Sequence, residues 1–111
     1  FLGLIDYFKL PNLYQKAKVN IFASSCENCP NILLEILASG RPLLCSNINP
    51  MPEFAGDSAL YFNPHNPEEL FEQMELLTPE VEPKLIENLN ARSKSFSWKS
   101  TSEKTLKVLI D

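Results

Sequence analysis

The chain has 111 residues, of which 44% are hydrophobic and 22% are charged, and its 10 Lys and Arg against 14 Asp and Glu give a formal net charge of -4. These values are typical of one globular domain and exclude disorder as the main state. Without a basic excess, nonspecific nucleic-acid binding is not expected. No membrane span is expected either, because the longest uncharged stretch, Pro42 to Pro52, has 11 residues and a span needs about 20.

The first half of the chain predicts strands that alternate with helices. Apolar runs of strand length and helically spaced apolar residues mark five elements. These are a strand at Phe1–Ile5, a helix at Leu10–Lys18, a strand at Val19–Ala23, a helix at Asn31–Ser39 and a strand at Pro42–Ser46. We expect Pro30 at the first helical position of the second helix and Gly40 at its end.

The second half predicts one more strand and three more helices. After a short segment around Glu53–Gly56, the strand is expected at Ala59–Phe62. Asn66, Pro67 and Glu69 form an N-cap pattern that opens a helix to about Leu77. Two amphipathic helices are expected at about Glu82–Ser93 and Ser97–Ile110, with Trp98 packed against the sheet edge.

This order of elements predicts the fold class. Strands alternating with helices through short loops form a mostly parallel, Rossmann-like α/β sheet with helices on both faces. The uncharged strand at Pro42–Ser46 fits such a sheet, because both of its faces would be covered. Ligands of these sheets bind outside the carboxyl ends of the strands. The loop between Ala23 and Pro30 is therefore the expected place for chemistry.

Two glutamates flank the start of the predicted helix at Asn31. Glu27 lies in the loop and Glu35 lies two turns inside the helix, in the spacing E-x7-E. Between them, free backbone N–H groups of Asn31 and Ile32 and the helix dipole would suit a phosphate. Ionised carboxylates would suit the vicinal hydroxyl pairs of a ribose or a sugar. Spacing alone leaves open that both are ordinary solvated acids.

A longer string of residues resembles a known family. FASSCENCPNILLEILASG from Phe22 to Gly40, followed by RPLLCSN and by MPE at Met51–Glu53, resembles the C-terminal donor-binding domain of retaining glycosyltransferases of family 4, which have the GT-B fold. The resemblance extends almost from end to end. It includes Gly3, the YF-x-P of Tyr61–Pro64 and the late Phe96-Ser97-Trp98.

The resemblance implies roles for individual residues. Glu27 would be the catalytic glutamate that faces the transferred sugar, and Glu35 would hold the ribose hydroxyls of the nucleotide. The backbone of the loop and helix start would approach the diphosphate and sugar, through Asn28, Cys29, Pro30, Asn31 and Ile32. The family usually has Gly where this chain has Asn28, and an aromatic residue followed by Gly or Pro where it has Cys29 and Pro30.

The resemblance also implies the reaction. A sugar would pass from a nucleotide-sugar donor to a glycan or lipid-linked acceptor in polysaccharide biosynthesis, with no metal ion, no cofactor and no general base. Residues 1–111 would form part of the donor domain, and the first strands of that domain and the acceptor domain would lie upstream. We therefore expect the isolated chain to be inactive. The full-length enzyme would be cytoplasmic, with peripheral membrane association open to it.

Two other functions remain open from the sequence. Cys26 and Cys29 sit between a strand and a helix, as in thioredoxin-like redox domains, where the helix N-terminus lowers a thiol pKa. A noncatalytic nucleotide-sugar-binding module could also keep this fold. Three cysteines cannot all pair within the chain, which favours free thiols in a reducing compartment, and we expect Cys45 in the core.

Overall fold

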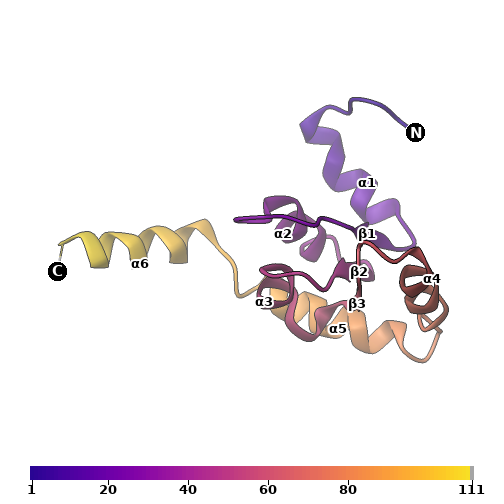
Figure 1. Cartoon of the computed structure of the whole chain (residues 1–111). Helices are drawn as coiled ribbons and strands as arrows, with labels where there is room; N and C mark the ends of the chain where they lie inside the picture. The colour runs from indigo at the N-terminus through magenta and orange to yellow at the C-terminus, as the bar shows by residue number, and fades with distance from the viewer. Residues whose placement is uncertain (111) are drawn as a thin grey trace.

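The computed structural model describes residues 1–110 and contains a parallel sheet of three short strands (Figure 1). The strands lie side by side in chain order: β1 (Asn20–Phe22), β2 (Leu43–Ser46) and β3 (Leu60–Phe62). Both strand pairs are parallel. The carboxyl ends of all three strands therefore lie at one edge of the sheet.

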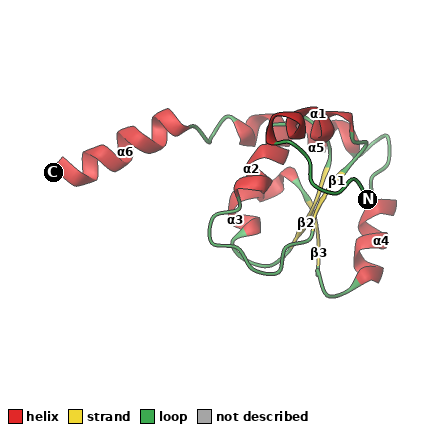
Figure 2. Cartoon of the chain, turned by 90° about the horizontal axis from the view of Figure 1, so that it is seen from above, coloured by secondary structure: helices red, strands yellow, loops and turns green. Residues whose placement is uncertain are grey.

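All of the helices except α6 lie around this sheet (Figure 1). Along the chain they are η1 (Tyr7–Lys9), α1 (Leu10–Lys16), α2 (Asn31–Leu37), α3 (Met51–Ala55), η2 (Gly56–Ser58), α4 (Pro67–Glu75), α5 (Glu82–Ser93) and α6 (Trp98–Ile110). Figure 2 shows α2 and α3 on one side of the sheet and α4 on the other. The predicted α/β class, the parallel sheet and the covering of both faces are thus confirmed.

β2 is the central strand, and all four of its residues are buried. Leu43 and Cys45 belong to the core cluster beneath α2. Because successive side chains of a strand point to opposite faces, Leu44 lies on the other face, where α4 contacts β2 and β3. This double burial explains why the strand carries no charge.

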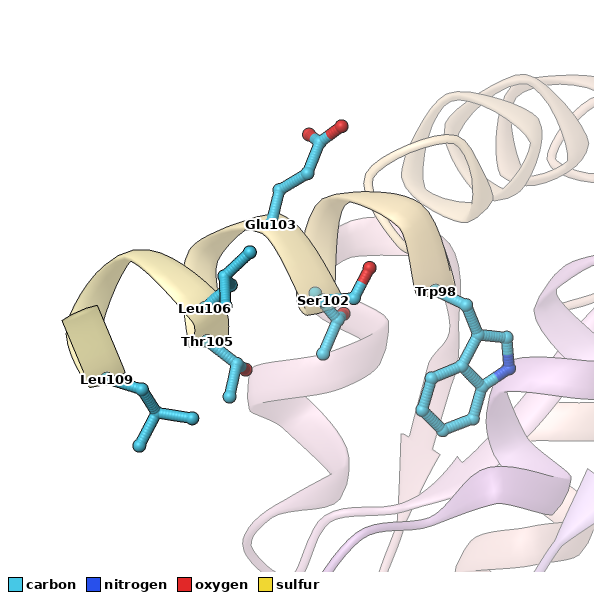
Figure 3. Close-up of a pocket in the computed structure, with 7 residues that line it drawn as sticks. Trp98, Ser102, Glu103, Thr105, Leu106 and Leu109 are labelled. Carbon is cyan, nitrogen blue, oxygen red and sulfur yellow. The ribbon is translucent and has the colours of Figure 1, made fainter.

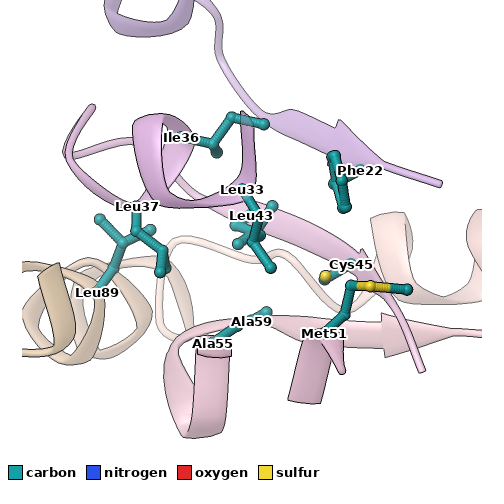
Figure 4. Close-up of a cluster of buried hydrophobic side chains, with 10 residues drawn as sticks. All are labelled: Phe22, Leu33, Ile36, Leu37, Leu43, Cys45, Met51, Ala55, Ala59 and Leu89. Carbon is teal, nitrogen blue, oxygen red and sulfur yellow. The ribbon is translucent and has the colours of Figure 1, made fainter. Parts of the chain in front are cut away.

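The main core lies between the sheet and three helices (Figure 4). α2 contributes Leu33, Ile36 and Leu37, and α5 contributes Leu89. The rest of the cluster comes from α3, β1, β2 and the residue before β3: Met51, Ala55, Phe22, Leu43, Cys45 and Ala59. Leu33, Leu37 and Leu89 are completely buried, so α2 cannot shift without opening the core.

Arg92 joins the end of α5 to the end of α3. Its Nε donates to the carbonyl oxygen of Phe54 at 2.8 Å, and its Nη2 donates to the carbonyl oxygen of Glu53. Its guanidinium also lies 5.1 Å from the ring centroid of Phe96, which stacks on Phe54. Cationic side chains at a helix C-terminus satisfy its free carbonyls and complement its dipole. α3, a helix of five residues, is stabilised in this way.

The predicted strand at Phe1–Ile5 is wrong. These residues form no strand, and Phe1, Leu2 and Leu4 are exposed. A strand needs a neighbour to pair its backbone, and Figure 1 shows the segment extending from α1 away from the sheet. At its end, the Asp6 carboxylate accepts a hydrogen bond from the N–H of Phe8 and so caps η1.

The predicted packing of Trp98 against the sheet edge is also wrong. Trp98 begins α6 and is 84% exposed, because α6 projects from the body of the molecule (Figure 1). The predicted cap of this helix is confirmed, since Ser97 Oγ accepts a hydrogen bond from the N–H of Ser100. Within residues 1–110, no helix combines the length and the apolar character that crossing a bilayer would require.

The start of α4 follows the predicted cap with one difference. Asn66 Oδ1 accepts from the N–H of Glu68, as expected of an N-cap. Glu69, however, does not reach back to the N–H of Asn66, which donates to the carbonyl of Asn63. Its carboxylate instead accepts from the N–H of Asn63 and the side chain of Asn66, so Glu69 ties the end of β3 to α4.

We predict that Leu89→Ala lowers the free energy of unfolding by about 2 to 5 kcal/mol, because it leaves a cavity where α5 meets α2. Chemical denaturation of the chain measures this. Leu106→Ala, the same change at an exposed position of α6, is the control and should cost less than about 0.5 kcal/mol. Equal losses in the two variants would contradict this description of the core.

The three thiols should differ in reactivity. Burial raises the pKa of Cys45 to about 12, so at pH 8 almost none of it is the reactive thiolate. Cys26 and Cys29 are exposed. A chromogenic disulfide reagent at pH 8 should titrate two thiols in the native chain and the third only after denaturant is added. Release of all three at one rate from the native chain would disprove the burial of Cys45.

Candidate functional site

The loop at residues 23–30 lies where the sequence places the site, between the end of β1 and the start of α2. The loop at residues 47–50 follows β2 and leads into α3 at the same edge of the sheet. In parallel α/β sheets this edge is where ligands bind. The two loops and the start of α2 therefore form the candidate functional site.

Glu27 is held within its loop. Its side chain is half-buried, and its Oε1 accepts a hydrogen bond of 2.8 Å from Ser24 Oγ. A freely solvated loop acid would have neither the burial nor the partner. The carboxylate is therefore fixed near the end of β1, and its second oxygen is available to a ligand.

The start of α2 differs from the prediction in two respects. Pro30 has φ -79° and ψ 75°, and the N–H of Asn31 donates to the carbonyl of Cys29 at 2.9 Å. This geometry is an inverse γ-turn, and it occupies a donor that was expected to be free for a phosphate. Pro30 therefore lies one residue before the helix and not at its first position.

The predicted loop residues lie on both sides of this turn. Asn28, Cys29, Asn31 and Ile32 are exposed, whereas the Pro30 ring is buried. The surface between Glu27 and the first turn of α2 is thus open to a ligand. The buried Pro30 ring anchors this surface to the interior of the protein.

Glu35 lies on α2 facing α1, and both of its carboxylate oxygens have a partner. Tyr7 donates to Oε1 at 3.2 Å and Tyr14 donates to Oε2 at 3.4 Å. A groove of about 180 Å³ runs between the two helices here, lined by Pro11, Tyr14, Gln15, Glu35, Ala38 and Ser39. Glu35 therefore forms a hydrogen-bonded cluster with two tyrosines and is not an isolated surface acid.

The two tyrosines act as neutral donors. The hydrogen bond to Glu35 and its negative charge raise the pKa of Tyr7. Burial, followed by the charge of Glu35 and the hydrogen bond to it, raises the pKa of Tyr14. Both hydroxyls therefore keep their protons in the physiological range and can go on donating to the carboxylate.

Glu27 and Glu35 have separate partners and lie on either side of the exposed start of α2. Their use by one ligand stays a prediction, because Glu27 does not line the groove beside Glu35. The sequence did not single out Ser24 or Tyr7 as their partners. A local signal was present only for Ser24, which lies three residues before Glu27.

A larger hollow runs along one side of α6 (Figure 3). All of its lining residues belong to this helix: Trp98, Thr101, Ser102, Glu103, Thr105, Leu106 and Leu109. One helix alone does not enclose a ligand, and the hollow includes no predicted site residue. We therefore place the candidate site at the edge of the sheet and not on α6.

Comparison with known proteins identifies the family of the chain. Residues 1–79 match the family described as Glycosyl transferases group 1. The O-antigen chain mannosyltransferase B of Escherichia coli is 28% identical over 110 residues, which are 96% of this chain and 28% of that protein. The serotype-specific mannosyltransferase WbdA of Escherichia coli is 34% identical over 104 residues, which are 92% of this chain and 13% of that protein.

A solved structure shares the fold. Sucrose-phosphate synthase from Thermosynechococcus elongatus, a GT-B glycosyltransferase, superposes with a TM-score of 0.85 at 22% identity, over 98% of this chain and 29% of that one. The chain therefore spans less than a third of the proteins compared here. By its sequence match over residues 1–79, the chain belongs to the group 1 family of glycosyl transferases.

Proposed function

We propose that this chain supplies part of the donor site of a retaining glycosyltransferase of family 4. The enzyme would move a hexose from a nucleotide-sugar to a glycan or lipid-linked acceptor. One observation carries the proposal: Glu27 lies in the loop at the carboxyl edge of a parallel sheet and Glu35 lies in the helix that follows, with the exposed first turn of α2 between them, in a chain of the glycosyl transferase family. Since two relatives are named mannosyltransferases of Escherichia coli, mannose is the first sugar to test.

Glu35 is proposed to bind the ribose of the donor. A carboxylate offers about four lone-pair positions, and two neighbouring hydroxyls can each donate to one oxygen. This contact is the same before and during the transfer. It therefore contributes to donor affinity and not to the rate at saturation.

Glu27 is proposed to face the sugar that is transferred. In a retaining front-face reaction the bond from the anomeric carbon to the phosphate oxygen breaks while the bond to the acceptor oxygen forms on the same face. The acceptor proton passes to the departing phosphate oxygen, so no general base is needed. Positive charge develops on the sugar during this step, and a fixed carboxylate nearby stabilises it.

The diphosphate is proposed to lie over the exposed backbone at Asn28 and the first turn of α2, whose dipole favours an anion. Because the N–H of Asn31 is already bonded, the diphosphate needs further contacts besides those of the helix start. We propose that basic residues of the first strands of the domain, upstream of residue 1, supply them. The donor enters as a substrate, and the proposal includes no metal ion or other cofactor.

The acceptor is proposed to bind to a separate N-terminal domain of the full-length protein. The chain spans 28% or less of the two mannosyltransferases compared here, which leaves room for such a domain. A cytoplasmic enzyme that associates peripherally with the membrane would meet both a soluble donor and a lipid-linked acceptor.

The isolated 111-residue chain should therefore transfer no sugar. We would incubate it with GDP-mannose, UDP-glucose and other nucleotide-sugars, together with glycan and lipid-linked acceptors. The full-length protein is the positive control. Turnover by the isolated chain would show that the acceptor and the diphosphate need nothing beyond residues 1–111.

Substitutions of the two glutamates in the full-length enzyme should separate their roles. Glu35→Gln should raise KM for the donor by the equivalent of about 1 to 3 kcal/mol, because one charge-assisted hydrogen bond is lost. Glu27→Gln should lower kcat by more than it raises KM, because its charge matters most in the transition state. Steady-state kinetics with varied donor concentration measure both effects.

Glu72→Gln is the matched control, since Glu72 is exposed on α4 and lies outside the site. It should leave both constants unchanged. The assignment of roles is wrong if Glu27→Gln behaves like this control while Glu35→Gln abolishes kcat at saturating donor.

The two other functions considered from the sequence are not favoured. The family match and the GT-B neighbour give the loop around Cys26 and Cys29 the context of a transferase and not of a thioredoxin-like domain. The intact pair of Glu27 and Glu35 argues against a noncatalytic binding module. We therefore expect the double change of Cys26 and Cys29 to Ser to leave transfer largely intact.

A further inference from the structure

We propose that Tyr7 and Tyr14 are positioning residues that hold the Glu35 carboxylate in the orientation that receives the ribose hydroxyls. This inference rests on the proposed role of Glu35 in donor binding. It adds that the ribose site is built by two segments of the chain, η1 with α1 and the middle of α2.

The geometry of the cluster is the first argument. The two hydroxyls approach different oxygens of Glu35, at 3.2 Å for Tyr7 and 3.4 Å for Tyr14. One donor on each oxygen fixes the rotation of the carboxylate about its terminal bond, which a single partner would leave free. A free glutamate side chain would lose this rotation only when a ligand binds, at a cost in affinity.

The capacity of the carboxylate is the second argument. Of its roughly four lone-pair positions, the tyrosines use two, one on each oxygen. One position per oxygen is left, which suits two adjacent hydroxyls. The tyrosines thus leave room for a diol while fixing the direction from which it can approach.

The anchoring of α1 is the third argument. Asn20 Nδ2 donates to the carbonyl of Tyr14 at 3.3 Å and to Ser39 Oγ at 3.4 Å, so it links α1 to the end of α2. Arg41 Nε donates to the carbonyl of Gln15 at 2.7 Å. Tyr14 also packs against the core cluster. Its hydroxyl is therefore carried by a helix whose position relative to α2 is fixed.

Tyr7 is placed by a local turn. The Asp6 side chain accepts from the N–H of Phe8 at 2.9 Å, and the Asp6 carbonyl accepts from the N–H of Lys9 at 2.9 Å. These bonds form η1 and direct Tyr7 toward α2. Tyr7 is 64% exposed, and its side chain is held by an edge contact with the Phe8 ring and by its hydrogen bond to Glu35.

The test measures how well the full-length protein distinguishes ribose from deoxyribose. Calorimetry would give the affinities of UDP, GDP and ADP and of their 2′-deoxy forms for the wild type, Tyr7→Phe and Tyr14→Phe. Each variant should bind the preferred ribonucleotide about threefold to tenfold more weakly, as for one lost hydrogen bond. The 2′-deoxy form should lose less affinity. The ratio of the affinity for the ribonucleotide to the affinity for its 2′-deoxy form should therefore fall.

Tyr61→Phe is the matched control. The Tyr61 hydroxyl donates to the carbonyl of Gly56, away from Glu35. This variant removes a tyrosine hydroxyl bond and can lower stability, but it should keep the wild-type ratio. In the kinetic assay, the Tyr7 and Tyr14 variants should raise KM for the donor and leave kcat within about twofold.

A double-mutant cycle completes the test. In a Glu35→Gln background, Tyr7→Phe and Tyr14→Phe should no longer change the ratio, because they act through that carboxylate. The inference is overturned if Glu35→Gln lowers the ratio while both tyrosine variants match Tyr61→Phe. If Glu35→Gln itself leaves the ratio unchanged, or if no nucleotide binds to the wild type, the proposed role of Glu35 fails and this inference fails with it.

Discussion

Burial of one face of α2 against the sheet determines where the rest of the chain can place its chemistry. Leu33 and Leu37 are completely buried between the sheet and α5, so the helix has one position and one rotation. That rotation brings Glu35 to the side of α1 and leaves the first turn of α2 open. The loop from β1 must then end at Pro30, and Glu27 lies within it. The buried face of α2 therefore sets the position of Glu35, whereas Glu27 is held by Ser24 within the loop.

Much of the fold could be predicted from the sequence because its signals are local. The apolar run of β2 and the apolar spacing of α2 each reflect burial of that element, and both were predicted within a few residues. The strand predicted at Phe1–Ile5 failed because pairing is not local. An apolar run looks the same with a neighbouring strand as without one, and here Phe1 and Leu4 are exposed. The predicted packing of Trp98 against the sheet edge failed for a similar reason. Its helix has a normal cap and apolar pattern but projects from the body of the molecule (Figure 1).

In the candidate site, too, the sequence shows the local features and not the contacts between distant residues. The spacing of Glu27 and Glu35 is a local property of a loop and a helix, so the sequence could point to the pair, and its role as a donor site stays a prediction. The tyrosine partners of Glu35 come from 28 and 21 residues away, and no periodicity predicts such contacts. The γ-turn at Pro30, which occupies the N–H of Asn31, depends on backbone angles that Pro restricts only in part.

The central claim is that the two carboxylates share one nucleotide-sugar. The most direct measurement is a crystal structure of the full-length protein with its nucleotide-sugar donor bound, or with a nonhydrolysable analogue. The account predicts ribose hydroxyls within hydrogen-bond distance of the Glu35 carboxylate, the sugar next to Glu27 and the diphosphate over the start of α2. A donor whose ribose lies away from Glu35, with the carboxylate still bonded only to Tyr7 and Tyr14, would contradict it.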